Sequence, residues 1–458
     1  MTLVDIATCL NIIPSSYKLI VVYNNDNYFS GLLCTSTLGG SSFIMARNTS
    51  PASSRRPRIL KVWPLSLLAL KATASLLVVP RQEEHVCPEE ESTSSHCQHC
   101  KFIDFKARPE EQDHSNIFSR RIKPKKYHEI NRIAKVASSC AEKLGCQFIV
   151  DIGSGLGHLG RVLALRYGLR VCCLEEQTCL TEKARKLDEQ LVKILLRKQG
   201  ATPLPPVHIN MSIEAAIKCD KFSKLVHDVF EAPVGSTLKF GIVGLHPCGD
   251  LGPTLMRLLV NCPGACFINL VGCCYMKLSD DGTSAVRGYP LSGYTMSLNY
   301  HLSYESREVA CHALETYTQR LRAGHISELK VHCYRAVLET IIIKNWPELK
   351  HSGLRSIKHV QDMNFSDYAA FAVERLGLKL PQVDLECAQT IEQLNQWQRV
   401  VIFYSLRLLL APCVESTLLL DRMLFLQEKG KQPNLYLIQL CFNCCITFRD
   451  FEFPVACL

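Results

Sequence analysis

Short apolar runs alternate with segments of helical spacing over residues 147–278, and this alternation limits the fold more than any other feature. The runs are QFIVDIG (147–153), LRVCCLE (169–175), PVHINMSI (206–213), KFGIVGLH (239–246) and ACFINLVGCCY (265–275). Nearly continuous apolar strands that alternate with helices form parallel sheets covered on both faces. The sequence therefore predicts an α/β fold over residues 118–278, with a doubly wound, mostly parallel, Rossmann-like sheet.

The rest of the chain is predicted to add helices on either side of this core. The expected regions are an irregular extension (1–57), a helix followed by a polar linker (58–117), a helical region (279–430) and a tail (431–458). Residues 60–80 have apolar residues at helical spacing after Pro64, which predicts one buried helix. The linker contains Cys97-x-x-Cys100 with nearby histidines, which is the spacing of half a zinc site. No second such pair follows at a zinc-ribbon interval, so we predict no metal ligand.

A basic run precedes the first predicted strand and continues into an amphipathic helix. The helix has Ile130, Ile133, Val136 and Ala137 on one face. The run is formed by Arg120, Arg121, Lys123, Lys125 and Lys126. Such a run is either a solvated face or a contact to a phosphate-bearing substrate. The candidate substrate-binding residues are Lys125, Lys126 and His128.

Composition excludes few functions. The net charge of +9 permits a nucleic-acid partner but is too small to argue for one. Cysteine is frequent, with 24 residues, many of them inside apolar runs. The opening MTLVDIATCLNIIPSSY has no basic and apolar regions of the kind that form a secretory signal. We therefore expect reduced thiols and an intracellular protein, cytoplasmic or nuclear.

Residues 400–420 are apolar and long enough to span a membrane. Arg407 and Glu415 lie within this stretch, and each charge costs about 2.5–3.5 kcal/mol near the bilayer centre. Pro412 interrupts the stretch as well. We expect a buried core helix, with a single-pass membrane anchor as the alternative.

A glycine-rich loop follows the first predicted strand in QFIVDIGSGLGHLGR (147–161). Glycines allow a tight turn and let a ligand approach the main chain. A dinucleotide site requires G-x-G-x-x-G, but His158 occupies the third glycine position. The residues fit D-x-G-x-G-x-G instead, as at S-adenosylmethionine sites. The candidate cofactor residues are Asp151, Gly153, Ser154, Gly155 and Gly157.

An acidic residue ends the second predicted strand. Glu175 can accept both ribose hydroxyls of a nucleoside, the same use that dinucleotide sites make of a carboxylate. Glu176 is the adjacent alternative, but the end of the strand favours Glu175. Together the loop and the carboxylate predict S-adenosylmethionine as the cofactor. The other interpretation is an α/β domain without a cofactor.

Reactive side chains follow the fourth and fifth predicted strands. Ligands bind beyond the carboxyl ends of parallel strands, so the acceptor is expected there. His246 and Asp250 are candidates to orient or deprotonate an acceptor. The other candidates are Cys248, Cys273, Cys274 and Tyr275. The cysteines can be nucleophiles, packed thiols or, with His246, metal ligands.

Several motifs in order resemble the methyltransferase-like 25 family, of the type described as containing a ribosomal RNA adenine dimethylase domain. They are KPKKYHEI, VDIGSGLGHLGR, GLHPCGDL, VGCCYMKLSD, ACHALE and HCYRAVLET, and the resemblance covers roughly residues 60–430. It implies a class I methyltransferase fold of seven strands, with methyl transfer from S-adenosylmethionine. Asp151, Gly153, Gly155, Gly157 and Glu175 match the cofactor positions. The resemblance implies no particular acceptor.

The adenine label can be tested against the residues. Adenine N6 enzymes usually have N-P-P-aromatic after the fourth strand, whereas this chain has HPCGD there. The HPCGD and CCY motifs resemble tRNA 2′-O-methyltransferases of the Trm-thirteen type, as isolated motifs only. The acceptor therefore stays open among rRNA, tRNA and protein. A non-catalytic scaffold that binds S-adenosylmethionine or RNA is the alternative function.

The two ends of the chain depart from the family pattern. In the implied fold, a sixth strand and a reversed seventh strand beside the fifth complete the sheet. The tail LYLIQLCFNCCITF is apolar enough for strands but lacks a turn signal for that hairpin. The final strands are therefore expected to be absent in one interpretation.

Overall fold

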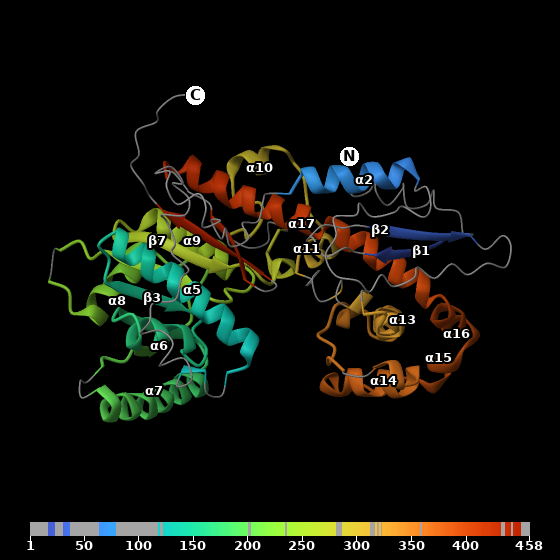
Figure 1. The fold of residues 1–458 in the computed structure, drawn as a ribbon, viewed down its shortest axis with the longest axis horizontal. Helices are drawn as coiled ribbons and strands as arrows, with labels where there is room; N and C mark the ends of the chain where they lie inside the picture. The colour runs from blue at the N-terminus through green and yellow to red at the C-terminus, as the bar shows by residue number, and fades with distance from the viewer. Residues whose placement is uncertain are drawn as a thin grey trace, which may run out of the picture. The chain divides into compact units, whose positions relative to one another are not determined.

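The computed structural model describes a chain of two compact units. The described residues are 17–22, 31–36, 64–78, 118–119, 122–199, 203–233, 236–280, 286–311, 317, 320–321, 323–357, 360–431, 436–440 and 443–449. One unit contains residues 78–312 and 413–458, and the other contains residues 1–77 and 313–412 (Figure 1). Both units are therefore assembled from segments that are far apart in the sequence.

A sheet of seven strands forms the centre of the unit containing residues 78–312. The parallel strands are β3 (Phe148–Ile152), β4 (Arg170–Glu175), β5 (Val207–Asn210), β6 (Phe240–Gly244) and β7 (Ala265–Val271). The strand order is β5-β4-β3-β6-β7-β9-β8. From β3 the chain adds β4 and β5 on one side, and it then returns to add β6 and β7 on the other side. The point where the strand order reverses therefore lies between β3 and β6, and doubly wound sheets bind ligands at this point. The predicted α/β core is thereby confirmed.

The last two strands are present, so the expectation that they are missing is wrong. Strand β9 (Asn443–Arg449) pairs antiparallel with β7, with Thr447 opposite Asn269. Strand β8 (Tyr436–Leu440) pairs antiparallel with β9 at the edge of the sheet. Apolar and β-branched residues favour strands, and they were enough for pairing here without a Gly or Pro turn signal.

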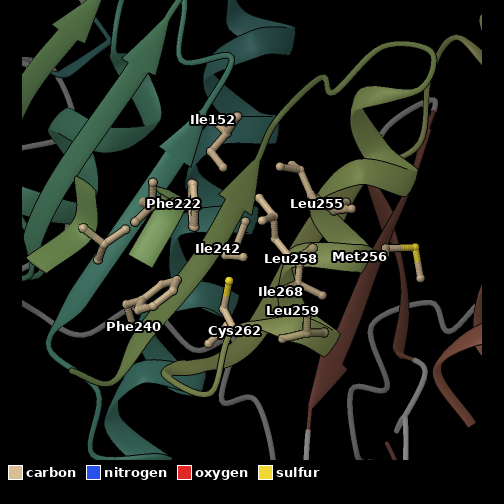
Figure 2. Packing of buried hydrophobic residues seen from close by; sticks show 14 of the residues in the cluster. Ile152, Phe222, Phe240, Ile242, Leu255, Met256, Leu258, Leu259, Cys262 and Ile268 are labelled. Carbon is tan, nitrogen blue, oxygen red and sulfur yellow. The ribbon is translucent and has the colours of Figure 1, made fainter. Parts of the chain in front are cut away.

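Helices cover both faces of this sheet. One face is packed by α5 (Pro124–Lys143), α6 (His158–Leu165) and α7 (Thr178–Gln199), and the other by α8 (Cys219–Phe230) and α9 (Leu251–Asn261). Successive residues of β3 point to opposite faces, with Ile149 in one core and Val150 in the other. Figure 2 shows Ile242 of β6 and Leu255 of α9 within the second core. The predicted apolar face of α5 is fully buried, from Ile130 to Ala137.

Short elements follow β7 in the same unit. They are the 3-10 turn η2 (Tyr275–Lys277) and the helices α10 (Gly293–Ser297) and α11 (Tyr304–Val309). Helix α11 packs back against η2, and its Arg307 donates to the carbonyl of Leu278.

The other unit is mainly helical, as predicted for most of residues 279–430. Its elements are α2 (Leu65–Leu76), η3 (Ile326–Leu329), α13 (Lys330–Asn345), η4 (Pro347–Leu349), η5 (Val360–Asp362), α14 (Phe365–Val373), η6 (Glu374–Leu376), α15 (Gln382–Glu386) and α16 (Ala388–Asn395). Its core contains Leu338 and Ile342 of α13 against Tyr368 and Ala369 of α14.

Two expectations for the N-terminal part differ from the structure. Residues 1–57, expected to be irregular, contain a pair of antiparallel strands, β1 (Tyr17–Val22) and β2 (Gly31–Ser36). Helix α2 forms where predicted, but it is not buried: Leu65 is 82% exposed and Leu76 is 84% exposed. An apolar composition at helical spacing predicted the helix correctly, but it did not supply a surface for the helix to pack on.

Helix α17 (Trp397–Glu428) contains the stretch considered as a membrane span. Among the described residues it alone has the length and hydropathy to cross a membrane, and half of its most apolar window is buried. Its C-terminal part has buried charged residues with partners in the sheet unit. Asp421 accepts hydrogen bonds from the backbone N–H of Leu291 at 2.8 Å and of Ser292 at 2.9 Å. Because these charges are paired within the protein, we propose that α17 is a core helix.

Asp421→Ala tests this proposal. The substitution leaves two buried backbone N–H groups without their acceptor, and the hydroxyl of Ser292 keeps only Thr295 as a partner. We expect the free energy of unfolding, measured with urea, to fall by about 3 kcal/mol. The matched control is Glu428→Ala, which also removes the acceptor of two backbone N–H groups but at an exposed position. Equal effects of the two substitutions would contradict the core role of α17.

Candidate functional site

The glycine loop after β3 adopts the backbone that its sequence predicts. Gly153, Gly155 and Gly157 have φ values of 69°, 57° and 67°, in the left-handed region that side chains disfavour. The N–H groups of Gly153 and Ser154 donate to the carbonyl of Leu174 at 2.9 and 3.1 Å. The end of β4 therefore holds the loop in place at the point where the strand order reverses.

The loop faces space suited to a ligand. A Cβ added at Gly155 would meet no atom of the described residues within 4 Å. The hydroxyl of Ser154 is buried and has no hydrogen-bond partner among the described residues. A buried polar group usually has a partner, so an unpaired hydroxyl in a glycine loop fits a site whose ligand supplies one. Gly157 differs, because its Cβ would lie 2.6 Å from Cε1 of His208.

Glu175 turns its carboxylate toward this loop. Its Oε2 accepts from the N–H of Gly155 at 2.8 Å, and its Oε1 accepts from the N–H of Gln177 at 3.0 Å. Each carboxylate oxygen has a second lone pair for a ligand hydroxyl. The side chain of the alternative, Glu176, is exposed. The geometry therefore favours Glu175 as the residue that contacts a ribose.

Asp151 lies beneath the loop and is almost completely buried. Its Oδ2 accepts from the N–H of Gly160 at 3.1 Å. Burial raises the pKa of this carboxyl to about 7, although that hydrogen bond opposes the shift. A group that titrates near neutral pH beside a candidate ligand site is able to respond to a bound charge.

Gly160 was missed by the sequence analysis. A Cβ there would collide with Sγ of Cys173 on β4. Helix α6 can therefore approach the sheet closely only with glycine at this position. The signal was present as Gly155-x-Gly157-x-x-Gly160, which begins two residues after the pattern that fails at His158.

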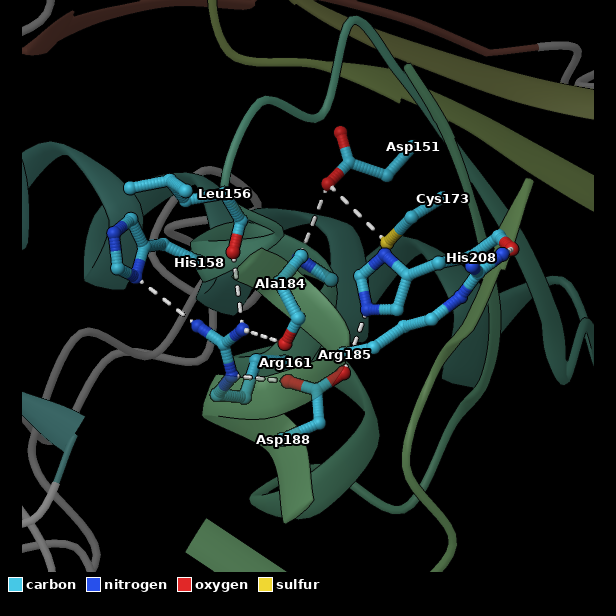
Figure 3. Close-up of polar contacts among 10 residues, drawn as sticks. Asp151, Leu156, His158, Arg161, Cys173, Ala184, Arg185, Asp188 and His208 are labelled. Carbon is cyan, nitrogen blue, oxygen red and sulfur yellow. Dashed lines mark hydrogen bonds and ion pairs between the residues drawn. The ribbon is translucent and has the colours of Figure 1, made fainter. Parts of the chain in front are cut away.

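A buried ionic network supports the loop from below, and it was also missed. Asp188 of α7 accepts from Nε of Arg161, and its Oδ2 lies 2.6 Å from Nε2 of His208 (Figure 3). Arg161 also donates to the backbone carbonyl of Leu156 in the loop at 3.0 Å. It donates as well to the backbone carbonyl of Ala184 in α7 at 3.2 Å. The network thus connects the loop, α6, α7 and β5.

The start of α5 lies near the carboxyl edge of the sheet. Glu129 is buried, with Oε2 lying 3.7 Å from Nε2 of His246 and Oε1 lying 3.9 Å from Nζ of Lys125. The charge of Lys126 acts on both Asp151 and His158. Lys123, Lys125, Lys126 and His128 are exposed, and Arg120 and Arg121 lie outside the described residues. The predicted substrate lysines are therefore near the predicted cofactor residues.

The loops after β6 and β7 bring three predicted cysteines together. Sγ of Cys248 lies 3.4 Å from Sγ of Cys273, and Cys274 is close to both. Hydrogen bonds from the neighbouring thiols lower the pKa of Cys274 to about 2, whereas the pKa of Cys273 is raised well above its usual range.

Two other predicted catalytic residues have structural contacts. Oδ1 of Asp250 accepts from the N–H of Ser279 at 2.8 Å, which ties the two loops together. Tyr275 is 2% exposed, and its hydroxyl donates to Glu415 at 3.3 Å. Because its side chain is buried, Tyr275 is poorly placed to contact a bound substrate. The possible half zinc site at Cys97 and Cys100 lies outside the described residues.

Comparison with known proteins assigns this part of the chain. Residues 125–281 match the family model described as "Methyltransferase domain". This segment is a methyltransferase domain. The domain contains the glycine loop, Glu175 and the cysteine loops, so all predicted cofactor residues and all predicted catalytic residues lie within it. The resemblance implied by the sequence motifs is thereby confirmed at the level of the domain.

Two curated proteins similar to the chain are both called "Probable methyltransferase-like protein 25". The protein from Mus musculus is 23% identical over 425 residues, covering 67% of this chain and 70% of its own length. The protein from Homo sapiens is 30% identical over 200 residues, covering 41% and 32% respectively. The stretch aligned at the higher identity is thus about a third of the human protein.

Solved methyltransferases are also similar to part of the chain. Magnesium protoporphyrin IX methyltransferase from Synechocystis, with bound SAH, is 12% identical and covers 31% of this chain and 55% of its own, with a TM-score of 0.21. At this TM-score the likeness carries no weight for function.

Proposed function

We propose that the protein transfers a methyl group from S-adenosylmethionine to an acceptor. The observation that supports this most is the loop after β3, in which Gly153, Gly155 and Gly157 have positive φ values. The loop also has the hydroxyl of Ser154, which has no partner among the described residues, and it contacts the carboxylate of Glu175. The methyltransferase domain supports the same reaction. When bound, S-adenosylmethionine supplies a methyl group on a positively charged sulfur.

The residues present fit this cofactor. Glu175 would accept the ribose hydroxyls, Gly155 would leave room for the ligand against the main chain, and Ser154 would supply a hydrogen bond. Asp151 would provide negative charge beneath a cationic ligand. His246, at the rim beside Glu129, has an imidazole nitrogen that can take a proton from an acceptor. Positioning is the larger part of the catalysis expected of such a site.

RNA is the acceptor class that the exposed lysines of α5 favour. Nζ of Lys125 lies 3.9 Å from Oε1 of Glu129, whose Oε2 lies 3.7 Å from Nε2 of His246. Phosphate contacts made by such lysines position a nucleic acid without reading its sequence. The HPCGD motif in place of N-P-P-aromatic argues against adenine N6 as the acceptor atom. Protein is the alternative acceptor, and a scaffold that binds without catalysis is the alternative function.

Transfer of labelled methyl groups distinguishes these functions. The purified full chain is incubated with S-adenosylmethionine that is labelled on the methyl group, together with total RNA or total protein from cells. We expect label in RNA that ribonuclease removes. Label only in protein would refute the RNA acceptor, and label in neither fraction would favour the scaffold.

Binding of S-adenosylmethionine should strengthen as the pH rises. A bound cation favours the ionised form of Asp151, whose pKa in the ligand-free protein is about 7. We expect the affinity to increase about tenfold between pH 6 and pH 8, because binding then needs less proton release. The raised pKa also means that the stability of the ligand-free protein decreases as the pH rises through 7. Titration calorimetry at several pH values measures the first effect, and urea unfolding measures the second.

The variant Asp151→Asn provides the control for this pH dependence. Asparagine keeps the acceptor for the N–H of Gly160 but cannot ionise. Its affinity should be independent of pH over the same range. A pH dependence equal to that of the wild type would assign the effect to another group.

A further inference from the structure

Two loops at the carboxyl edge of the sheet bring three thiols to one place. Strands β6 and β7 are parallel neighbours, with Gly244 opposite Leu270. The chain continues from them into loops that contain Cys248 on one side and Cys273 and Cys274 on the other. Because parallel neighbours end at the same edge, the three cysteines meet although they are distant in sequence. The proposed methyl transfer gives no role to this cluster.

The spacing of the sulfur atoms suits a metal ion. All three Sγ atoms lie within 4.8 Å of one another, and those of Cys248 and Cys273 are 3.4 Å apart. Thiolates bound to tetrahedral zinc at about 2.3 Å lie about 3.8 Å apart. The sulfurs would therefore reach ligand geometry with small movements.

The two loops are held in this arrangement by contacts of their own. Gly249 has a φ of 59°, and a Cβ there would lie 3.0 Å from the carbonyl oxygen of Lys277. The glycine thus lets the loop of Cys248 press against the backbone that follows Cys274. The hydrogen bond from the N–H of Ser279 to Asp250 fixes the same pair of loops at 2.8 Å. The thiols are therefore preorganised rather than brought together by flexible ends.

We propose that Cys248, Cys273 and Cys274 bind one thiophilic metal ion, with Zn²⁺ as the ion that fits the ligand set. Soft thiolate ligands select zinc and copper(I) over magnesium and calcium. Binding forms three metal–sulfur bonds and releases the thiol protons to solvent. Cys248 is exposed and the other two are half-buried, so an ion can reach the cluster from solvent. The fourth position remains for water or an acceptor, as at zinc sites that act on substrates.

From the sequence alone, metal binding was one of three alternatives for these cysteines, and the proposal selects it for Cys248, Cys273 and Cys274. It does not depend on the proposed methyl transfer, because its readout is metal binding itself. A disulfide between Cys248 and Cys273 is the competing explanation for their short separation. The two explanations differ in the reduced protein, where only the metal site persists.

Cobalt titration of the full chain tests the proposal. Co²⁺ replaces Zn²⁺ at thiolate sites and gives a charge-transfer absorption that only thiolate ligands produce. The chain carries Cys97→Ser and Cys100→Ser throughout, which removes the other candidate spacing from the measurement. We expect about one equivalent of Co²⁺ to bind the reduced protein with this absorption, and Zn²⁺ to displace it.

Variants of the cluster locate the site. Cys248→Ser and Cys274→Ser should each weaken Co²⁺ binding at least tenfold and reduce the absorption. Cys387→Ser is the matched control, since Cys387 is also half-buried and caps α16, where serine is a good substitute. Cys248 is exposed, so its serine variant should keep the fold even where the variant of Cys274 does not.

Two results would overturn the proposal. One is equal Co²⁺ affinity and absorption for Cys248→Ser and Cys387→Ser. The other is reduced protein that binds no Co²⁺, with peptide mapping of the unreduced protein showing Cys248 bonded to Cys273. Circular dichroism of each variant confirms that the comparison is between folded proteins.

Discussion

Gly155→Arg should abolish measurable binding of S-adenosylmethionine. Gly155 has a φ of 57°, and the direction of its Cβ points into space that no described atom occupies within 4 Å. An arginine side chain would fill the space in which the ligand has to lie, and its charge would repel a cationic cofactor. We expect the affinity to fall at least about 100-fold, which corresponds to about 2.7 kcal/mol. Isothermal titration of the full chain measures it.

Gly145→Arg is the control for backbone strain. Gly145 has a φ of 60° and equally open surroundings, but it lies in the turn between α5 and β3, before the amino end of that strand. Both substitutions place arginine in a left-handed conformation, at a cost of about 1–2 kcal/mol. Gly145→Arg should therefore keep the affinity of the wild type. Equal binding by the two variants would place the cofactor away from the glycine loop.

Asp188→Ala should destabilise the methyltransferase domain more than any surface substitution. The carboxylate is the partner of both Arg161 and His208, and all three side chains are almost fully buried. Without it, the guanidinium of Arg161 is a buried charge that no carboxylate neutralises. Removing one member of such a buried pair costs about 3–5 kcal/mol. We expect a loss of this size in the free energy of unfolding, measured with urea and circular dichroism.

The neighbouring residue provides the comparison. Glu189→Ala removes a carboxylate from the same helix at an exposed position, and it should change stability by less than about 1 kcal/mol. Asp188→Ala should also weaken binding of S-adenosylmethionine, because Arg161 holds the loop carbonyl of Leu156. A loss of stability no larger than that of Glu189→Ala would show that the network is dispensable.

Local patterns predicted the elements that form the site. Apolar runs gave the five parallel strands, and the spacing of Gly153, Gly155 and Gly157 gave a turn whose backbone only glycine adopts readily. The carboxylate of Glu175 followed from its place at the end of a strand. The gathering of Cys248 with Cys273 followed from the rule that parallel neighbours end at one edge. Each of these inferences needs only residues close in sequence or one rule of sheet topology.

The features that were missed depend on contacts between distant segments. Asp188 lies within a helix of ordinary charged composition, and nothing near it in sequence indicates that His208 of another element is its partner. The prediction that α2 is buried was wrong, because periodicity shows that a helix has an apolar face without showing what covers that face. The final strands were doubted because the tail lacks a turn signal for their hairpin, although β9 pairs with β7 and β8 pairs with β9. The hydrogen bond that Asp250 accepts from the N–H of Ser279 was likewise not predicted, because it joins two separate loops.

Formation of S-adenosylhomocysteine tests the central claim most directly. The purified full chain is incubated with S-adenosylmethionine and cellular RNA, and the product is quantified by mass spectrometry. The proposed function predicts S-adenosylhomocysteine that increases with enzyme and with RNA, and that is absent with Gly155→Arg but present with Gly145→Arg. No product with RNA or with protein fractions, from a chain that binds S-adenosylmethionine, would contradict catalysis.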